Sequence, residues 1–209
     1  MSYKKQIAIV ILNYNGLISL GPTLLYRCIL SVLKSEYEDF IVIFVDNGSK
    51  DRSIEFIKKF FKDYIAKGLL DIIALPRNYG WSGGNNRGAL YAIKKYDPDY
   101  LVFLNNDIFI EDPKWLRKII EESATSGCEL SSPLVYEFNL RKYVIGNILD
   151  RNGTSKPYVI TDSTLRRLGI KGIKTIPAKY LHGAILVVSR KVFDLLKGFD
   201  ENTENRLAP

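Results

Sequence analysis

Short apolar segments alternate with amphipathic segments through the first 125 residues of the chain. Four apolar segments are rich in β-branched or aromatic residues and have the length of strands that are buried on both faces: 6–12, 40–45, 69–75 and 100–104. Apolar residues at helical spacing follow the first of them, in a stripe made of Leu25, Cys28, Ile29, Val32 and Leu33. This repeated order of strand and helix predicts a parallel sheet with right-handed crossovers.

Two further helices are predicted in the same half of the chain. A second apolar stripe contains Ile54, Ile57, Phe61 and Ile65. The next helix is expected to begin at Asp112, a capping residue that is followed by proline at the first helical position.

The pattern is weaker after residue 127. Segments 128–138 and 141–149 are candidate strands, whereas the polar segment 150–172 is predicted to be a loop. A last strand is expected at 183–189, where Ser189 would cap a short helix that ends at Gly198.

Polar residues stand at the end of each of the four predicted parallel strands. These strand ends comprise Asn13, Tyr14 and Asn15; Asp46, Asn47, Gly48 and Ser49; Arg77 and Asn78; and Asn105, Asn106 and Asp107. Parallel strands place their carboxyl ends at one edge of the sheet, where open α/β folds bind ligands. The alternative is that each group is only a turn or a helix cap, because the same residue types are common in turns.

Composition limits the function classes without selecting one. The 209 residues are 46% hydrophobic and 25% charged, which is typical of a globular chain, and no apolar segment has the roughly 20 residues that a membrane span needs. The net charge of +7 favours phosphate-bearing ligands. The basic residues are scattered, however, so a solvated surface is the alternative and no nucleic-acid partner is predicted.

Cys28 and Cys128 form no CxxC pair and are expected to be buried free thiols.

A glycine-rich segment at 77–93 is predicted to be a loop that runs into a helix. Such a loop lets the backbone approach an anion, although close packing of helix and sheet explains the glycines equally well. It is neither a Walker motif nor the dinucleotide fingerprint, which would follow the first strand, so a nicotinamide-dependent enzyme is disfavoured.

A carboxylate at a strand end, Asp46 or Asp107, can accept the N3 proton of uracil or thymine or hold a divalent cation. With a single aspartate, the segment 105–107 would hold such an ion only together with a diphosphate.

Five segments in this order resemble the family-2 glycosyltransferases of the GT-A fold, most of all the rhamnosyltransferase-like branch. They are VILNYNG at 10–16, VDNGSKDRS at 45–53, RNYGWSGGNNRGA at 77–89, FLNND at 103–107 and GAILVVSRKVFDLLKGFDE at 183–201. The resemblance implies an α/β fold of the GT-A type, a three-layer α/β/α sandwich with a mostly parallel central sheet. It also implies inverting transfer of a sugar from a UDP or dTDP donor, with dTDP-rhamnose as one candidate, to a glycan or lipid-linked acceptor in polysaccharide biosynthesis.

The resemblance also suggests roles for individual residues. Asp107 would bind Mg²⁺ or Mn²⁺, because FLNND occupies the position of the family's DxD motif, and Asp46 would recognise the base. The residues expected to contact the nucleotide are Asn13, Tyr14, Asn15, Asp46, Asn47, Arg77, Asn78, Gly80, Gly84, Asn105 and Asn106.

The catalytic base is not identified by the sequence. In the resembled family it is an aspartate of an ED motif that lies about ten residues beyond GFDE, and the sequence here reads GFDENTENRLAP. Glu201, Glu204 and His182 are the weak candidates for this role. The alternative to an enzyme is therefore a GT-A module that binds a nucleotide or a partner without turnover.

The domain organisation expected from these patterns is a single GT-A domain over 1–209. Residues 1–125 would form the nucleotide-binding half, and 126–209 a truncated part of the acceptor-side half. A cytoplasmic location is expected, with peripheral contact at the inner membrane face and formation of homo-oligomers as further expectations.

Overall fold

The computed structural model describes residues 5–137, 141–149, 155–160 and 181–202. The strands are β1 (Ile7–Asn13), β2 (Phe40–Asp46), β3 (Leu70–Ala74), β4 (Tyr100–Asn105), β5 (Leu130–Ser131), β6 (Val135–Glu137), β7 (Lys142–Leu149), β8 (Ser155–Ile160) and β9 (Ile185–Ser189). The helices are α1 (Gly16–Ser19), α2 (Pro22–Leu33), α3 (Ser53–Phe60), α4 (Lys62–Ala66), α5 (Gly80–Tyr96), α6 (Trp115–Ser126) and α8 (Arg190–Leu196).

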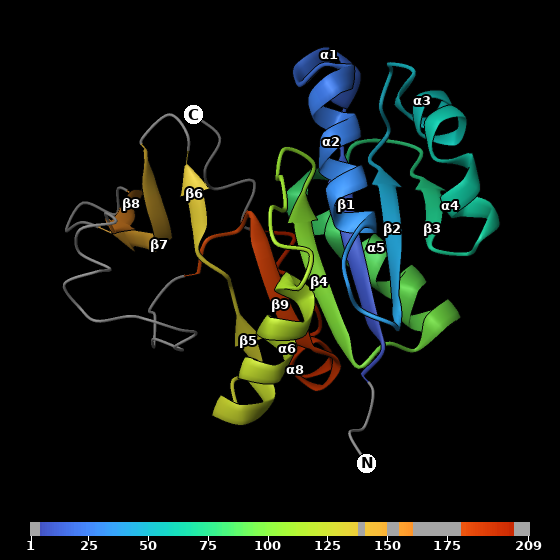
Figure 1. Ribbon diagram of the computed structural model, residues 1–209. Helices are drawn as coiled ribbons and strands as arrows, with labels where there is room; N and C mark the ends of the chain where they lie inside the picture. Colours follow the sequence, from blue (N-terminus) through green and yellow to red (C-terminus); the bar gives the residue numbers. More distant parts are fainter. Residues whose placement is uncertain (1–4, 138–140, 150–154, 161–180, 203–209) are drawn as a thin grey trace.

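A six-stranded sheet forms the centre of the molecule, with the strand order β3-β2-β1-β4-β9-β5 (Figure 1). The first four strands in this order pair in parallel, as the alternating sequence pattern predicts. β9 runs antiparallel to β4, so the start of β9 lies beside the end of β4. A second sheet of three strands, β6-β7-β8, lies to one side of the central sheet (Figure 1).

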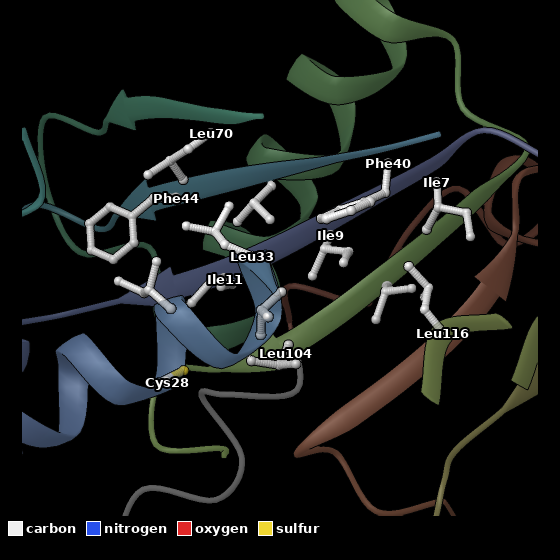
Figure 2. Close-up of a cluster of buried hydrophobic side chains, with 14 of the residues drawn as sticks. Ile7, Ile9, Ile11, Cys28, Leu33, Phe40, Phe44, Leu70, Leu104 and Leu116 are labelled. Carbon is white, nitrogen blue, oxygen red and sulfur yellow. The ribbon is translucent and has the colours of Figure 1, made fainter. Parts of the chain in front are cut away.

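Helices cover both faces of the central sheet and bury two apolar cores, because strand side chains alternate between the faces. On one face Ile7, Ile9 and Ile11 of β1 pack against α2, α3 and α6 (Figure 2). On the other face Ala8 and Val10 pack against α5 and α8. The resulting three layers confirm the predicted α/β fold with a mostly parallel sheet.

The helix predicted in the glycine-rich segment is confirmed, but it begins at Gly80, so the glycines of this segment lie in α5 and not in the preceding loop. Its glycines allow α5 to lie directly on the sheet. A Cβ atom at Gly84 would lie 2.4 Å from Leu12 Cδ1, and one at Gly88 would lie 2.6 Å from Val10 Cγ1. A side chain at either position would force its neighbours to shift, because real Cβ atoms do not approach so closely. Close packing, the alternative explanation of the pattern, therefore accounts for these two glycines.

The structure also corrects the two other helices predicted in the first half of the chain. The stripe at 54–65 does not form one helix, because Phe61 leaves the helical conformation and buries its ring 5.1 Å from that of Tyr26. The helix expected to begin at Asp112 begins only at Trp115, as α6. Asp112 Oδ1 instead accepts a hydrogen bond from Lys114 N in the turn before this helix.

In the segment predicted to be a loop, residues 155–160 form β8, which gains its backbone partners from β7. Cys28 is a buried free thiol as expected, but Cys128 is only half-buried.

A carboxylate on β3 ties the sheet to the end of α5. Asp71 accepts hydrogen bonds from the hydroxyls of Tyr91 and Tyr96, at 2.6 and 2.9 Å, and from Lys95 Nζ at 2.7 Å. Burial alone would raise the pKa of Asp71, but these hydrogen bonds outweigh it and lower the pKa to about 2.

We expect Asp71→Asn to lower the free energy of unfolding by about 1 kcal/mol, since it weakens charge-assisted hydrogen bonds at a partly exposed site. Because folding lowers the pKa from 3.8, the stabilisation is present above pH 4 and is lost as the pH falls from 3.8 towards 2. Thermal unfolding at pH 7 and pH 3 measures this effect. The exposed control Asp63→Asn should show no difference, and an equal loss in both variants would contradict the role of Asp71.

Candidate functional site

The polar ends of β1, β2 and β4 meet at one edge of the central sheet. Asn13 lies opposite Asp46 in the register of β1 and β2, and Leu12 lies opposite Asn105 in the register of β1 and β4. His182 precedes the antiparallel strand β9 and therefore lies at the same edge, since Ile185 is opposite Leu104. The predicted convergence of strand ends is thus observed, and we refer to it as the carboxyl edge.

A chain of hydrogen bonds joins three of these strand ends. The Asp46 carboxylate accepts from Asn13 Nδ2 at 3.1 Å through Oδ1 and from the Ser49 backbone N–H at 3.0 Å through Oδ2. Asn13 Oδ1 in turn accepts from Asn106 Nδ2 at 2.8 Å. Asn13 and Asp46 are 0% and 3% exposed, so this connected network satisfies polar groups that would otherwise be buried at a cost.

The network explains why a glycine follows the first strand. A Cβ atom at Gly16 would lie 2.1 Å from Asn13 Oδ1 and 3.2 Å from Asn106 Nδ2. Any side chain at this position would therefore displace the hydrogen bond between the two amides.

The turns after β1 and β2 are linked by the side chains of Asn15, Ser49 and Asp51, of which only Asp51 was not placed at a strand end by the sequence reasoning. Ser49 Oγ accepts from the backbone N–H of Asn15 at 2.8 Å, and Asn15 Oδ1 accepts from Lys50 N at 2.7 Å. Asp51 Oδ2 accepts from Leu17 N at 2.9 Å, at the start of α1. Ser49 and Asp51 belong to the segment GSKDRS, whose Ser and Asp spacing after a strand was the available signal.

Asn47 and Gly84 have structural roles at the start of α5, and their predicted contact with the nucleotide stays a prediction. Asn47 is 2% exposed. It donates to Asn78 Oδ1 and the Gly80 carbonyl oxygen, at 2.9 and 3.0 Å, and accepts from Tyr79 N at 3.0 Å. These bonds fix the start of α5 against β2. The buried Gly84 faces Leu12 and Asn47 and not a ligand.

Three of the predicted contact residues, Tyr14, Arg77 and Asn78, and the predicted metal ligand Asp107 are exposed at the carboxyl edge. Arg77 places its guanidinium 4.8 Å from the centre of the Tyr79 ring, and the Arg87 guanidinium lies 3.7 Å from the same ring. Arg77 therefore holds a positive charge beside the start of a 17-residue helix, whereas the charge of Arg87 is paired with Glu201 at 3.2 Å.

Asp107 is the exposed carboxylate at the end of β4. Among the described residues no group of three or more His, Cys, Asp or Glu side chains could enclose a metal ion. A hard cation at Asp107 would need further oxygen ligands from water or a bound phosphate, and this fits the preference of Mg²⁺ for incomplete protein shells. The neighbouring Cys28 is unsuited to metal binding, because burial and the Asp107 charge raise its pKa to about 12.

Trp81 and Asn105 join α5 to the end of β4. Trp81 Nε1 donates to Asn105 Oδ1 at 3.2 Å, and the indole packs edge-on against Phe199 at a centroid distance of 4.8 Å. Trp81, like Asp51, is a site residue that the sequence reasoning missed. Its aromatic character alone did not distinguish it from a core residue.

Glu201 is poorly suited to act as a general base. Its carboxylate accepts from Asn86 Nδ2 at 3.0 Å and pairs with Arg87 at 3.2 Å. The hydrogen bond from Asn86 and the Arg87 guanidinium lower the pKa of Glu201, whereas a base benefits from a raised pKa. This bonding argues against Glu201 as the base, and Glu204 lies outside the described residues. His182 accepts from Ala184 N through Nδ1 at 3.3 Å and is half-buried.

Comparison with known proteins defines the class of this fold. The structure is similar to the Pyrobaculum calidifontis mannosyltransferase PcManGT solved with GDP-mannose and Mn²⁺, with a TM-score of 0.64 and 14% identity over 96% of this chain and 49% of that chain. It is also similar to GalNAc-T7 solved with UDP, GalNAc and Mn²⁺, with a TM-score of 0.62 and 17% identity over 96% of this chain and 38% of that chain. Identities this low establish the fold alone, which is that of the GT-A glycosyltransferases.

The sequence then gives the family. Residues 8–196 match the family model for Glycosyl transferase family 2, and the chain belongs to this family. An uncharacterised glycosyltransferase of Haemophilus influenzae is 36% identical over 87 residues, which are 41% of this chain and 32% of the relative. The chain therefore spans half or less of the length of the proteins compared. In its described part, no helix combines the length and the apolar character that a membrane crossing requires.

Proposed function

We propose that the carboxyl edge binds a nucleoside-diphosphate sugar with a divalent cation, and that the chain takes part in transferring the sugar, with inversion, to a glycan or lipid-linked acceptor. The observation that carries this proposal is the convergence of the buried Asn13 and Asp46 with the exposed Asp107 at the ends of three adjacent parallel strands. Open α/β sheets bind ligands at this edge. Membership of a glycosyltransferase family supports a sugar as the transferred group.

The cation would enter together with the diphosphate. Asp107 supplies one carboxylate, and the phosphate oxygens would supply the ligands that the described residues lack. A cation in this position stabilises the negative charge that develops on the leaving diphosphate. The Mn²⁺ present with PcManGT and GalNAc-T7 supports the choice of a divalent ion.

Asp46 favours a pyrimidine base. Each of its two carboxylate oxygens already accepts one hydrogen bond within the protein. Each oxygen therefore keeps one lone pair, and one of these can accept the single N3 proton of uracil or thymine. We therefore propose a UDP or dTDP sugar as the donor, with dTDP-rhamnose as the candidate favoured by the sequence resemblance.

A thermal-shift panel tests this proposal. UDP, dTDP, GDP and ADP are compared at one common concentration, with and without Mn²⁺, because a nucleotide present at about 100 times its dissociation constant adds about 2.7 kcal/mol of stability and a weaker ligand adds less. We expect the uridine and thymidine nucleotides to stabilise the protein most, and only with the metal. A preference for GDP would contradict the role of Asp46, and no binding of any nucleotide would contradict the proposed function.

A binding module without turnover is the second candidate, and the bonding of Glu201 favours it. The carboxylate that the sequence offered as a base is occupied by Asn86 and Arg87. Hydrolysis or transfer of a UDP or dTDP sugar with Mn²⁺ distinguishes the two. Turnover supports the enzyme, whereas metal-dependent binding without turnover supports the module.

The cellular setting is also a proposal. A sugar-nucleotide donor and a lipid-linked acceptor would place the chain in polysaccharide biosynthesis, in the cytoplasm and at the inner membrane face. The net charge of +7 supports attraction to an anionic lipid surface. We also propose that the chain forms homo-oligomers, because the exposed Leu195 and Leu196 of α8 offer apolar surface for contact between copies.

A further inference from the structure

An exposed aromatic side chain lies among lysines where α3 ends and α4 begins. Phe60 is the last residue of α3 and is 51% exposed, although the next residue, Phe61, is buried. Lys58, Lys59 and Lys62 are exposed as well. We refer to Phe60 and these three lysines as the α3–α4 surface, which shares no residue with the carboxyl edge.

The ring of Phe60 is held in its exposed position by two other aromatic rings. Its centre lies 4.6 Å from that of Phe56 and 6.1 Å from that of Tyr26 in α2. Lys59 Nζ lies 5.5 Å from the centre of the same ring. Because the ring is already ordered, contact with a partner would cost little side-chain entropy.

The lysines of the α3–α4 surface are not neutralised within the described part of the chain. Lys5, Lys95 and Lys118 each pair with an aspartate. None of the three lysines of the α3–α4 surface forms an ion pair with a described residue. Residues 52–67 include five basic and two acidic side chains, so this short segment carries +3 of the chain's net charge of +7.

The α3–α4 surface lies on the β3 side of the central sheet, away from the second sheet (Figure 1). Helix α3 follows the end of β2 and leads away from the carboxyl edge, and its eight residues span roughly 12 Å. A partner that binds at the far end of α3 therefore leaves the carboxyl edge open.

We propose that the α3–α4 surface binds a membrane surface that contains anionic lipid. The unneutralised lysines provide attraction to lipid phosphates, and an exposed ring can enter the boundary between headgroups and acyl chains while the lysines reach the phosphates. This inference deepens the membrane contact proposed above by naming the residues that make it. It does not require that the carboxyl edge binds a nucleotide.

Lys58→Gln combined with Lys62→Gln tests the role of the charges. The wild-type protein should sediment with vesicles of phosphatidylglycerol and phosphatidylcholine in equal parts. The double variant should bind them about 30-fold more weakly, because each lysine near an anionic surface contributes a factor of about five.

The matched control combines Lys94→Gln with Lys197→Gln. It makes the same change in net charge at exposed positions on α5 and at the end of α8, which cover the opposite face of the sheet. We expect its affinity for the vesicles to equal that of the wild-type protein. No binding by the wild-type protein, equal binding to pure phosphatidylcholine vesicles, or an equal loss in both double variants would overturn the inference.

Phe60→Trp tests the apolar contact. Lipids with brominated acyl chains should quench the fluorescence that this variant adds. The fluorescence added by Leu90→Trp, at an exposed position on α5, should stay unchanged. Equal quenching in both variants, or quenching in neither, would overturn the insertion of the ring.

Titration of UDP with Mn²⁺ separates this inference from the proposed function. Vesicle binding through Lys58 and Lys62 without any nucleotide binding supports the inference and contradicts the proposed function alone. Nucleotide binding without vesicle binding overturns the inference alone. Binding of single-stranded RNA in place of vesicles would assign the α3–α4 surface to nucleic acid and would also overturn the inference.

Discussion

Replacing Asp107 by alanine is expected to abolish Mn²⁺-dependent binding of UDP. Asp107 is the exposed carboxylate that ends β4, and no group of metal-ligating side chains elsewhere in the described residues could replace it. The loss should reach about 100-fold in affinity, which corresponds to about 2.8 kcal/mol. Titration calorimetry with UDP at saturating Mn²⁺ measures it directly.

The control for this variant is Glu111→Ala, which removes an exposed carboxylate four residues further along the chain. It makes the same change in net charge without touching the strand end. We expect its metal-dependent affinity to equal that of the wild-type protein. An unchanged affinity in Asp107→Ala, or an equal loss in both variants, would contradict the assignment of Asp107.

Replacing Gly48 by alanine is expected to give the largest loss of stability, about 3 kcal/mol. Gly48 has a φ of +75°, which L-residues rarely adopt, and an added Cβ would lie 2.4 Å from the backbone carbon of Arg77. That backbone has little room to move, because Asn47 bonds Asn78, Tyr79 and Gly80 directly beyond it. Denaturant unfolding followed by circular dichroism measures the loss.

Gly68→Ala separates the two causes of the stability loss at Gly48, which are the left-handed backbone conformation and the close approach to Arg77. Gly68 has a similar φ of +69°, but no atom lies within 4 Å of an added Cβ. Its loss should be about 1 kcal/mol, the cost of the left-handed conformation alone. If both variants lose the same stability, the close approach of Gly48 to Arg77 contributes nothing.

The parallel half of the fold is readily predicted from the sequence, because its signal is local. The segments 6–12 and 100–104 agree within one residue with Ile7–Asn13 and Tyr100–Asn105. Strands buried on both faces leave an apolar run in the sequence that depends on no distant partner.

Features that depend on tertiary contacts were predicted less well. The glycines of α5 indicate a loop by local propensity, but contact with Val10 and Leu12 makes them helical residues packed on the sheet. Strand β8 exists through its pairing with β7, which the polar segment itself does not signal.

In the candidate site too, the features with a local sequence signal were predicted and those that depend on tertiary contacts were not. The residue types at each strand end and their common edge follow from the sequence, since parallel strands must end together. The hydrogen bonds do not, because Asn13 and Asn106 are 93 positions apart and meet only where Gly16 leaves room. That geometry separates the accessible Asp107 from the buried Asn47, although both were predicted to face a ligand.

The most direct test of the central claim is paramagnetic broadening of backbone amide signals by Mn²⁺ in the presence of UDP, with Mg²⁺ and UDP as the diamagnetic reference. The account predicts that Asn105 to Ile108 lose their signals when both ligands are present, while Gly68 and Asp99 at the opposite edge keep theirs. Broadening centred away from Asp107, or equal broadening without UDP, would contradict a metal-diphosphate site at the carboxyl edge.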